Sequence, residues 1–529
     1  MIDSRLLKLK YFLEQRDYHF LLIELSEYFE VSERQMGRLL KKWQEDNLIE
    51  YQSASGRGNK ASIKLIKDVE SLILKDIINR VPDLSVEELQ TILELPFEEK
   101  SIHVLQQTVN NVVLNVKEEQ VVIPYTNLPQ TLNPSHISTI EEAQVVYQIF
   151  ETLYRLTVDG KIQRNLISYD EWIDNELHLY LKKEVSFSNG DMLVAGDVKT
   201  VLDNLRTDSL YTRLYNMIED IIVINDFKLI LKFETKPKLF EYSLAQRYSS
   251  IYKDTGEEYL LGTGPYSISK FDESKIEVTY NAFYRGSQPE IHHITFTSDV
   301  EEVMKSNEEY QTKRVLTHFG DEFVLFNPSK NYSKAQRTFL SDMLLVCISE
   351  IVNGNVDIAK PTRQYAPGEI KISKEYVKVL VIDFNKPVYE LFREKMKAFG
   401  IEVIFYELTN EEYLNSNLLN MDVDFVWMFE SYNQHQPFKT LDLLTHCKFQ
   451  EWYGDFEDAR RITDQADYRP NESLKSLCNS FLRKIELMKY MVPIFVHEKS
   501  IELPITMKNI KEQPYGTIDF RMIINDNEQ

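Results

Sequence analysis

The sequence predicts a multidomain chain of the α+β class, and three observations lead to this prediction. Its 529 residues are too many for one hydrophobic core, so two to four domains are expected. Helical periodicity dominates the first 118 residues, apart from one short ribbon. From residue 119 onward, short strand-like runs alternate with helical stretches. We therefore expect a head at 1–66, a helical connector at 67–118 and a body at 119–529.

Three helices are predicted in the first 45 residues. The first spans Arg5–Gln15 and the second spans Leu22–Phe29, each with apolar residues at helical spacing. After a turn at Glu30-Val31, Ser32 is a good N-cap for the third helix. The apolar stripe of the second helix consists of Leu22, Leu25, Tyr28 and Phe29, and that of the third consists of Met36, Leu39, Leu40 and Trp43.

A short ribbon follows the third helix, whose opposite face is polar and basic. Strand-like runs at Leu48–Tyr51 and Ser62–Leu65 flank a glycine-rich, basic tip. This combination is typical of a winged helix-turn-helix, which places the helix in the DNA major groove and the hairpin on phosphates. The alternative is a small helical module whose basic face is merely solvated. The candidate DNA-binding residues are Ser32, Arg34, Gln35, Arg38, Lys41, Lys42, Arg57 and Lys60.

Charge is unevenly distributed along the chain. The net charge is −22, which argues against nucleic-acid binding over the whole surface. Between Ser32 and Leu65, however, seven basic side chains outnumber four acidic ones. A locally basic stretch on an acidic chain is typical of a DNA-binding head joined to a larger body with another role.

The sequence offers little for catalysis or metal binding. The motifs G-x-x-x-x-G-K-[ST], H-E-x-x-H and G-x-S-x-G are absent. His292 and His293 are adjacent, so on a strand they point to opposite faces and cannot share one metal simply. His446-Cys447 lacks partners at zinc spacing. We expect a protein that is not an enzyme and uses no cofactor or metal.

Targeting signals and cysteine usage indicate a cytoplasmic protein. Charges interrupt the apolar runs of the first 20 residues, unlike a signal peptide. No stretch approaches the ~18 apolar residues needed to span a bilayer. Cys347, Cys447 and Cys478 are far apart and lack C-x-x-C spacing, so buried free thiols are expected.

Several phrases of the body resemble the family 5 extracellular solute-binding proteins of the oligopeptide- and dipeptide-binding type. They are TLNP (131–134), VSFSNGDMLVAGDV (185–198), GTGPY (262–266) and SKIEVTYNAFYRG (274–286), in the order and spacing of that family. Asn133 stands where the family pattern has an aspartate. Val194 replaces a threonine of that pattern and Lys161-Ile162-Gln163 lacks its proline, so the ligand need not be a peptide.

This resemblance implies a two-lobed α/β body of the periplasmic-binding-protein-like type II fold, closing on its ligand like a hinge. Lobe I would cover about 119–325 and 498–529, and lobe II about 326–497. The crossover strands would lie near Phe323–Asn327 and Pro493–Glu502.

Candidate ligand-binding residues follow from the same resemblance. Glu430 would pair with an amine of a small-molecule or peptide ligand; the alternative is an ordinary surface charge. Trp427 and Tyr432 are as well explained as core aromatics, and Tyr266 as a structural residue. The full candidate set is Tyr266, Asn327, Trp427, Glu430 and Tyr432.

A winged head in front of such a body, without an export signal, resembles the SgrR family of bacterial transcriptional regulators. The resemblance implies a regulator that binds double-stranded DNA at one end and senses a solute at the other. It leaves open whether the connector joins two copies as a homodimer. Two alternatives remain: a transporter-type solute-binding protein with an unusual N-terminal extension, and a regulator whose binding body is vestigial.

Overall fold

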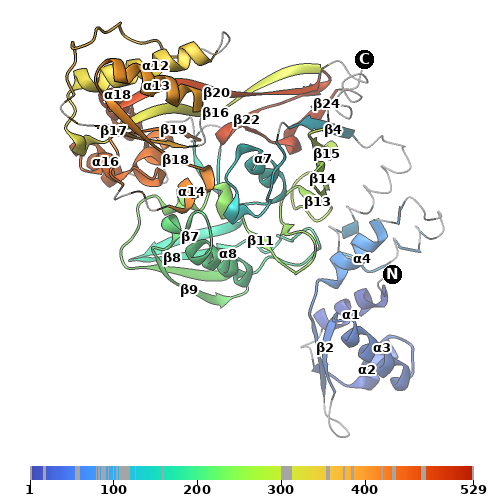
Figure 1. The fold of residues 1–529 in the computed structure, drawn as a ribbon. Helices are drawn as coiled ribbons and strands as arrows, with labels where there is room; N and C mark the ends of the chain where they lie inside the picture. The colour runs from blue at the N-terminus through green and yellow to red at the C-terminus, as the bar shows by residue number, and fades with distance from the viewer. Residues whose placement is uncertain are drawn as a thin grey trace.

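The chain forms three parts, a winged head, lobe I and lobe II, and it returns to lobe I after lobe II (Figure 1). The computed structural model describes residues 3–526 except 16–18, 54–59, 79, 82–83, 85–87, 89–90, 93–94, 99–100, 103–104, 106–118, 126, 158–159, 300–311, 353–357, 373, 375, 383–385, 417, 419–420, 432–436 and 466–471.

The head is a winged helix-turn-helix, as predicted, and its first two helices end within one residue of the predicted bounds. Its strands form a sheet in the order β1-β3-β2. The elements are α1 (Arg5–Glu14), β1 (His19–Phe20), α2 (Leu22–Tyr28), α3 (Glu33–Glu45), β2 (Ile49–Gln52) and β3 (Ala61–Leu65).

The apolar stripes of the head helices form its core. Met36, Leu40 and Trp43 of α3 are fully buried, as their spacing predicts. Tyr28 was expected on the inner face of α2, but 41% of it is exposed. It is the last residue of α2, where its ring packs edge-on against Phe29 at the rim of the core.

The start of the connector belongs to the head. Helix α4 (Val69–Ile78) buries Ile73, Leu74 and Ile77 in the same core as α1. Lys10 of α1 also pairs with Glu70 of α4, with 2.6 Å between Nζ and Oε2. The head therefore extends beyond the predicted boundary at residue 66. Much of the rest of the predicted connector, including residues 106–118, lies outside the described residues.

Lobe I contains two four-stranded sheets, in the orders β13-β14-β15-β4 and β7-β8-β10-β9. Its strands are β4 (Glu119–Pro124), β5 (Tyr154–Leu156), β6 (Ile162–Arg164), β7 (Ile167–Ile173), β8 (Glu176–Leu181), β9 (Ile218–Asn225), β10 (Lys228–Phe233), β11 (Tyr252–Lys253), β12 (Leu261–Gly262), β13 (Tyr266–Phe271), β14 (Lys275–Tyr280) and β15 (Ile291–Thr297). Its helices are α7 (Ile140–Ile149), α8 (Ala195–Thr207), α9 (Thr212–Tyr215) and α10 (Phe240–Ser243), with 3₁₀ turns η2 (Pro134–His136) and η3 (Arg247–Ser249).

Lobe II is built on the five-stranded sheet β18-β17-β19-β16-β20. Alternate residues of its inner strands face two apolar layers, one with α12 and α13 and the other with α15 and α18. Its further elements are η4 (Pro328–Lys330), α12 (Lys334–Ile351), β17 (Tyr376–Ile382), α13 (Lys386–Ala398), β18 (Glu402–Leu408), α14 (Asn410–Asn415), β19 (Phe425–Glu430), α15 (Phe438–Leu441), the π-helical turn η5 (Asp442–His446), α16 (Glu451–Gly454), α17 (Glu457–Gln465) and α18 (Glu472–Leu487).

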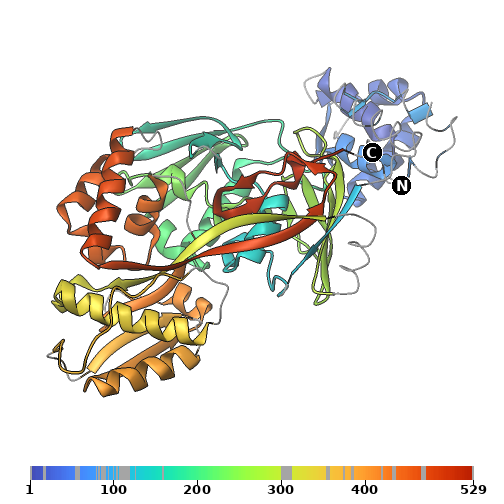
Figure 2. The same cartoon turned by 90° about the horizontal axis from the view of Figure 1, so that it is seen from above.

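Two long antiparallel strands join the lobes. β16 (Thr312–Phe326) and β20 (Met491–Pro504) pair from Thr312 opposite Pro504 to Leu325 opposite Met491. Figure 2 shows this ribbon running from lobe II along lobe I. The predicted crossover at Phe323–Asn327 is its lobe II end. Beyond it the chain adds β21 (Met507–Lys508), β22 (Glu512–Gln513), η6 (Pro514–Gly516), β23 (Thr517–Ile518), η7 (Phe520–Met522) and β24 (Ile524–Asn525) to lobe I.

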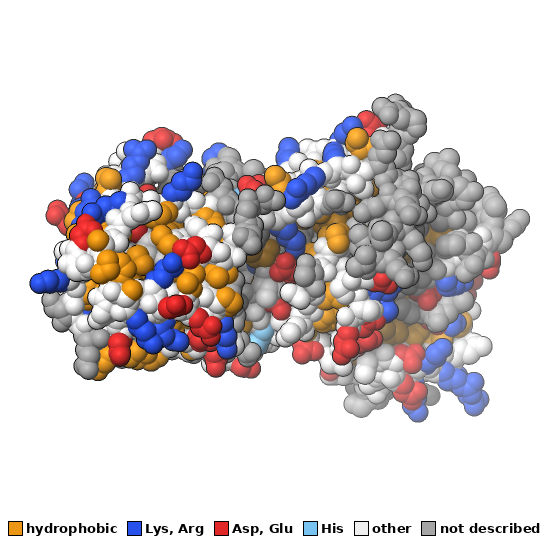
Figure 3. Space-filling model, turned by 45° about the horizontal axis from the view of Figure 1, so that its top comes forward, with side chains coloured by type: hydrophobic (Ala, Val, Ile, Leu, Met, Phe, Trp, Pro, Cys, Tyr) orange, Lys and Arg blue, Asp and Glu red, His pale blue; other side chains and the backbone are white. Residues whose placement is uncertain are grey.

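The surface mixes charges of both signs. On the face in Figure 3, acidic and basic side chains of lobe II are interspersed, with apolar atoms between them. No helix in the described part of the chain combines the length and apolar composition needed to cross a bilayer.

Candidate functional site

The outward face of α3 carries the predicted DNA-binding side chains. Arg34, Gln35, Arg38, Lys41 and Lys42 are all exposed, while the opposite face of α3 is in the core. The long cations are therefore free to extend, apart from a loose pair between Lys41 Nζ and Glu45 Oε1 at 3.7 Å. A helix with this division has the form that enters a major groove.

At the wing, Lys60 is exposed just before β3. Arg57, at the predicted tip of the hairpin, lies outside the described residues.

Ser32 and Gln35 form a capping box at the start of α3. Ser32 Oγ accepts a hydrogen bond from the backbone N–H of Gln35 at 3.3 Å. In return, Gln35 Oε1 accepts from the backbone N–H of Ser32 at 3.0 Å. Ser32 therefore stabilises the helix end, and the side-chain oxygen of Gln35 is engaged in this cap.

A cavity of about 610 Å³ lies between the two lobes, within the range of small-molecule sites. Lobe I contributes the N-terminal end of α7 and the segments around α9 and η3. Lobe II contributes the end of β19, α14, and the segment from α15 to Lys448. The polar and charged lining residues used below are Glu141, Arg213, Arg247, Glu430, Lys439, Asp442, His446 and Lys448.

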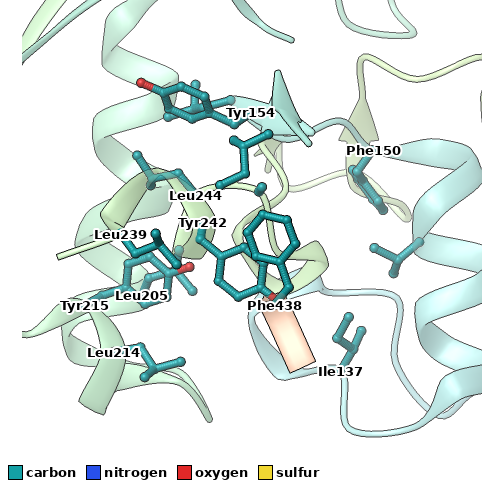
Figure 4. Packing of buried hydrophobic residues seen from close by; sticks show 14 of the residues in the cluster. Ile137, Phe150, Tyr154, Leu205, Leu214, Tyr215, Leu239, Tyr242, Leu244 and Phe438 are labelled. Carbon is teal, nitrogen blue, oxygen red and sulfur yellow. The ribbon is translucent and has the colours of Figure 1, made fainter. Parts of the chain in front are cut away.

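Direct contacts close the lobes beside this cavity. The rings of Tyr242 in lobe I and Phe438 in lobe II stack, with centroids 4.9 Å apart and planes 4° apart (Figure 4). The Tyr242 hydroxyl donates to Asp442 Oδ2 at 2.8 Å. Arg213 of α9 reaches across and donates to the backbone oxygen of His446. The structure is thus a closed arrangement of the lobes.

Glu430 lies at the end of β19, inside the cavity wall. Its Oε1 accepts a hydrogen bond from the Tyr413 hydroxyl at 3.0 Å. Burial raises the pKa of Glu430 to about 7, although the Tyr413 bond and the nearby charges of Arg213 and Lys448 oppose that rise. This carboxyl group therefore changes its charge near neutral pH.

The pKa values of three basic groups in the cavity wall are lowered, whereas that of Glu430 is raised. Burial, followed by repulsion from Arg213, lowers the pKa of His446 to about 3 and that of Lys448 to about 8. Burial also lowers the pKa of Arg247 to about 10. Burial in this part of the cavity therefore disfavours charge of either sign.

Of the predicted ligand residues, the structure brings Glu430 to the cavity and leaves three others elsewhere. Tyr266 is fully buried, and its hydroxyl donates to the backbone oxygen of Ile291 at 2.9 Å. Trp427 is packed in the lobe II core and donates to Glu322. Asn327 caps η4 by accepting from the N–H of Ser329 at 3.0 Å. Tyr432 lies outside the described residues.

The placements of Trp427 and Asn327 each have a simple physical reason. Alternate residues of a strand point to opposite faces, so Trp427 of β19 lies in the core with α12 and α13. Asn327 repeats at Asn-Pro-Ser (327–329) the cap that Asn133 makes at 133–135, where it accepts from Ser135 at 3.1 Å. Asn327 therefore stabilises a turn and does not line the cavity.

Sequence reasoning missed much of the cavity wall. Arg213, Arg247 and Lys448 line it, and the rings of Tyr211 and Tyr248 stack there with centroids 3.8 Å apart. No local pattern marks these residues, because they lie on short turns that only the closed lobes bring together.

Two family models match separate parts of the chain. Residues 4–119 match "Sugar transport-related sRNA regulator N-term". Residues 162–306 match "Bacterial extracellular solute-binding proteins, family 5 Middle". The chain thus combines a regulator-type N-terminal domain with a family 5 solute-binding domain.

Curated relatives match over part of their length. The HTH-type transcriptional regulator SgrR of Photorhabdus laumondii is 22% identical over 276 residues, which are 49% of this chain and 47% of that protein. The nickel-binding protein NikA of Staphylococcus aureus is 31% identical over 153 residues, 28% of this chain and 31% of that protein. The chain therefore spans half or less of the length of these relatives.

Solved structures share the two-lobed fold of the body. The oligopeptide-binding protein AppA from Bacillus subtilis has a TM-score of 0.54 at 14% identity, covering 77% of this chain and 98% of that one. A dipeptide-binding protein from Pseudoalteromonas sp. SM9913 has a TM-score of 0.55 at 12% identity, covering 77% and 100%. At these identities the likeness concerns the fold alone.

Proposed function

Because the chain joins a regulator-type winged head to a family 5 solute-binding body, we propose that it is a transcriptional regulator controlled by a small solute. The head binds double-stranded DNA through α3 and the wing. The interlobe cavity binds the solute. The protein acts by binding, in the cytoplasm, and ligand occupancy changes its affinity for DNA.

The observation that carries this proposal is a contact between the head and lobe I. The turn Ser188–Asp191 packs against α4 of the head: Lys75 Nζ donates to the backbone oxygen of Ser188 at 3.4 Å. Gly190 has a φ of +87°, and a Cβ there would lie 2.5 Å from Ser71 Cβ. Helix α4 lies on the side of the head that faces lobe I (Figure 1).

The same turn connects to the cavity through lobe I. The N–H of Ser188 donates to the backbone oxygen of Gly262 at 2.9 Å. Gly262 and Gly264 lie against the last turn of α7, and a Cβ on Gly262 would overlap Ile149 O. The N-terminal end of α7, including Glu141, lines the cavity. A ligand that moves α7 therefore moves groups in direct contact with the head.

The glycines of GTGPY acquire a role in this arrangement. Their missing side chains allow the strand to approach the backbone of α7, and the N–H of Gly264 donates to Ile149 O at 2.9 Å. Regulation further requires the ligand to prefer one arrangement of the lobes, typically by ~1–3 kcal/mol of coupling free energy.

DNA footprinting on the protein's own upstream region tests the regulator function. We expect a protected site, lost when Arg38 and Lys42 are both replaced by alanine and kept when Lys8 on α1 is replaced instead. Failure of the intact chain to protect any site contradicts DNA-based regulation. Recovery of the protein from the extracytoplasmic fraction of cells would favour the transport-type binding protein.

A vestigial body is the remaining alternative. The charged cavity favours a working site, because burying charge without a ligand is costly. In a thermal-shift screen of small metabolites and peptides, a ligand at ~100 times its dissociation constant should add ~2.7 kcal/mol to the stability of the body.

A further inference from the structure

Two charged groups of the cavity wall are neutralised within the protein. Glu141 Oε1 lies 3.0 Å from Lys499 Nζ. Lys439 Nζ lies 2.7 Å from Asp321 Oδ2. These pairs leave Arg213, Arg247 and Lys448 as the other long cations of the wall.

The hydrogen bonds of these three cations go to neutral oxygens. Arg213 donates to the backbone oxygen of His446, and Lys448 donates to those of Leu414 and Ser416. Arg247 donates to the backbone oxygen of Pro514 and, at 2.6 Å, to Thr517 Oγ1. Among the described residues, no carboxylate lies within ion-pair distance of any of the three cations.

With Glu141 paired to Lys499, two acidic groups of the wall, Glu430 and Asp442, face the three cations. Glu430 accepts from Tyr413, and its raised pKa leaves it only partly ionised at neutral pH. Asp442 accepts from Tyr242. Because Arg213 and Lys448 both lie near enough to Glu430 to act on its ionisation, an incoming amine at Glu430 would meet their repulsion.

Arg213 and Lys448 come from different lobes. Arg213 lies on α9 of lobe I, and Lys448 follows η5 of lobe II. Their side chains line the same cavity, and Arg213 donates to the backbone oxygen of His446, only two residues before Lys448. A ligand held by both cations would therefore join the lobes and relieve a repulsion that the empty cavity retains.

We propose that the interlobe cavity binds a small organic anion whose oxyanion group, a carboxylate or a phosphate, lies between Arg213 and Lys448. Aromatic and aliphatic wall residues such as Tyr248, Phe323 and Leu443 receive its apolar part. The inference rests on the proposed function only in taking this cavity as the sensing site. It replaces the amine-binding role expected for Glu430.

Thermal unfolding of the full chain tests this proposal with three probes at constant ionic strength: succinate, inorganic phosphate and the neutral succinamide. We expect one or both anions, and not succinamide, to raise the unfolding midpoint of the body. Arg213→Gln and Lys448→Gln should each weaken the apparent affinity about tenfold, the effect of losing one charge-assisted hydrogen bond. A shift with succinate alone assigns a carboxylate ligand, and a shift with phosphate alone assigns a phosphorylated one.

The matched control is Lys238→Gln. Lys238 also joins the lobes, with its Nζ 3.4 Å from Asp464 Oδ1, but it does not line the cavity. Its replacement should leave the anion-induced shift unchanged. No shift with either anion, or an equal loss in all three variants, overturns the proposal.

DNA binding of the same preparations without probe separates this inference from the proposed function. Wild-type protein that binds its site but responds to neither anion contradicts the anion inference alone. Protein that responds to an anion but binds no DNA contradicts the regulator function and supports the anion site.

Discussion

Gln35 has two roles to reconcile at the scale of a single residue. Its side-chain oxygen caps α3 through Ser32, and its exposed position on that helix faces the proposed DNA groove. Gln35→Glu retains the capping oxygen and adds a negative charge. We expect stability to change by less than about 0.5 kcal/mol and DNA affinity to fall at least about tenfold. Thermal unfolding and gel-shift titration measure the two effects separately.

Gln35→Ala is the companion variant. It removes the N3 side chain of the capping box, so the head should lose roughly 0.3–1.5 kcal/mol of stability. If Gln35→Glu binds DNA as tightly as the wild type, this side chain lies away from the DNA and its role is only that of a cap.

Glu430 predicts a pH dependence. Its pKa rises from 4.5 to about 7 on folding, so the folded protein binds more protons between these values. Stability contributed by this group is therefore present below pH 4.5 and is lost as the pH rises to about 7. Glu430→Gln keeps an acceptor for Tyr413 and removes the charge. At pH 8 we expect the variant body to be more stable than wild type, by up to about 3 kcal/mol.

Calorimetric scans at pH 5 and pH 8 measure this difference. Glu451→Gln, on the exposed surface of α16, is the control for loss of one charge. If the difference in unfolding free energy between wild type and Glu430→Gln is the same at pH 5 and pH 8, Glu430 does not have the raised pKa assigned to it.

Helix α4 and the Ser188–Asp191 turn form the element that we expect to transmit ligand binding. Gly190→Ala adds a Cβ that meets Ser71 and should separate the turn from α4. The variant should bind its ligand and its DNA normally, but ligand should no longer change DNA affinity. Gel-shift titrations with and without the ligand measure the coupling directly.

Gly256→Ala is the matched control. Gly256 also has a positive φ, +73°, but no atom lies within 4 Å of the position of its Cβ. This variant carries the backbone strain without the contact, so ligand should still alter its DNA binding. Equal coupling in both variants would mean that the signal reaches the head by another route.

Closure of the whole body depends on contacts between lobes. Tyr242→Phe keeps the ring on Phe438 and removes the hydroxyl that joins Asp442, at 2.8 Å, and Tyr515, at 2.9 Å. We expect the lobes to open more readily, with a larger radius of gyration by small-angle scattering and weaker ligand binding.

Tyr215→Phe tests the specificity of this effect. Tyr215 is also fully buried, but its hydroxyl donates to Ser243 at 2.6 Å within lobe I. The Tyr215→Phe variant should be less stable than the wild type, but its lobes should remain closed. If scattering does not distinguish the two variants, the Tyr242 hydroxyl is not a closing contact.

The sequence by itself determined the elements whose signals are local. Apolar spacing and the Ser32 cap predict α3 correctly, because the periodicity and the hydrogen bonds of a helix involve residues three or four positions apart. The motifs TLNP and GTGPY predict the type of body only through their resemblance to family 5 solute-binding proteins. In the structure the first contains a capped turn and the second a close backbone approach. Among the ligand candidates, only Glu430 of the described residues reaches the cavity.

Only the tertiary structure decided which side chains line the cavity and how the cavity is connected to the head. Arg213 and Lys448 are 235 positions apart in sequence, and their meeting depends on two lobes closing around one ribbon. Gly190 contacts Ser71 across 119 positions. Such contacts leave no periodic trace in a single sequence, because the free energy that holds them comes from packing between whole domains.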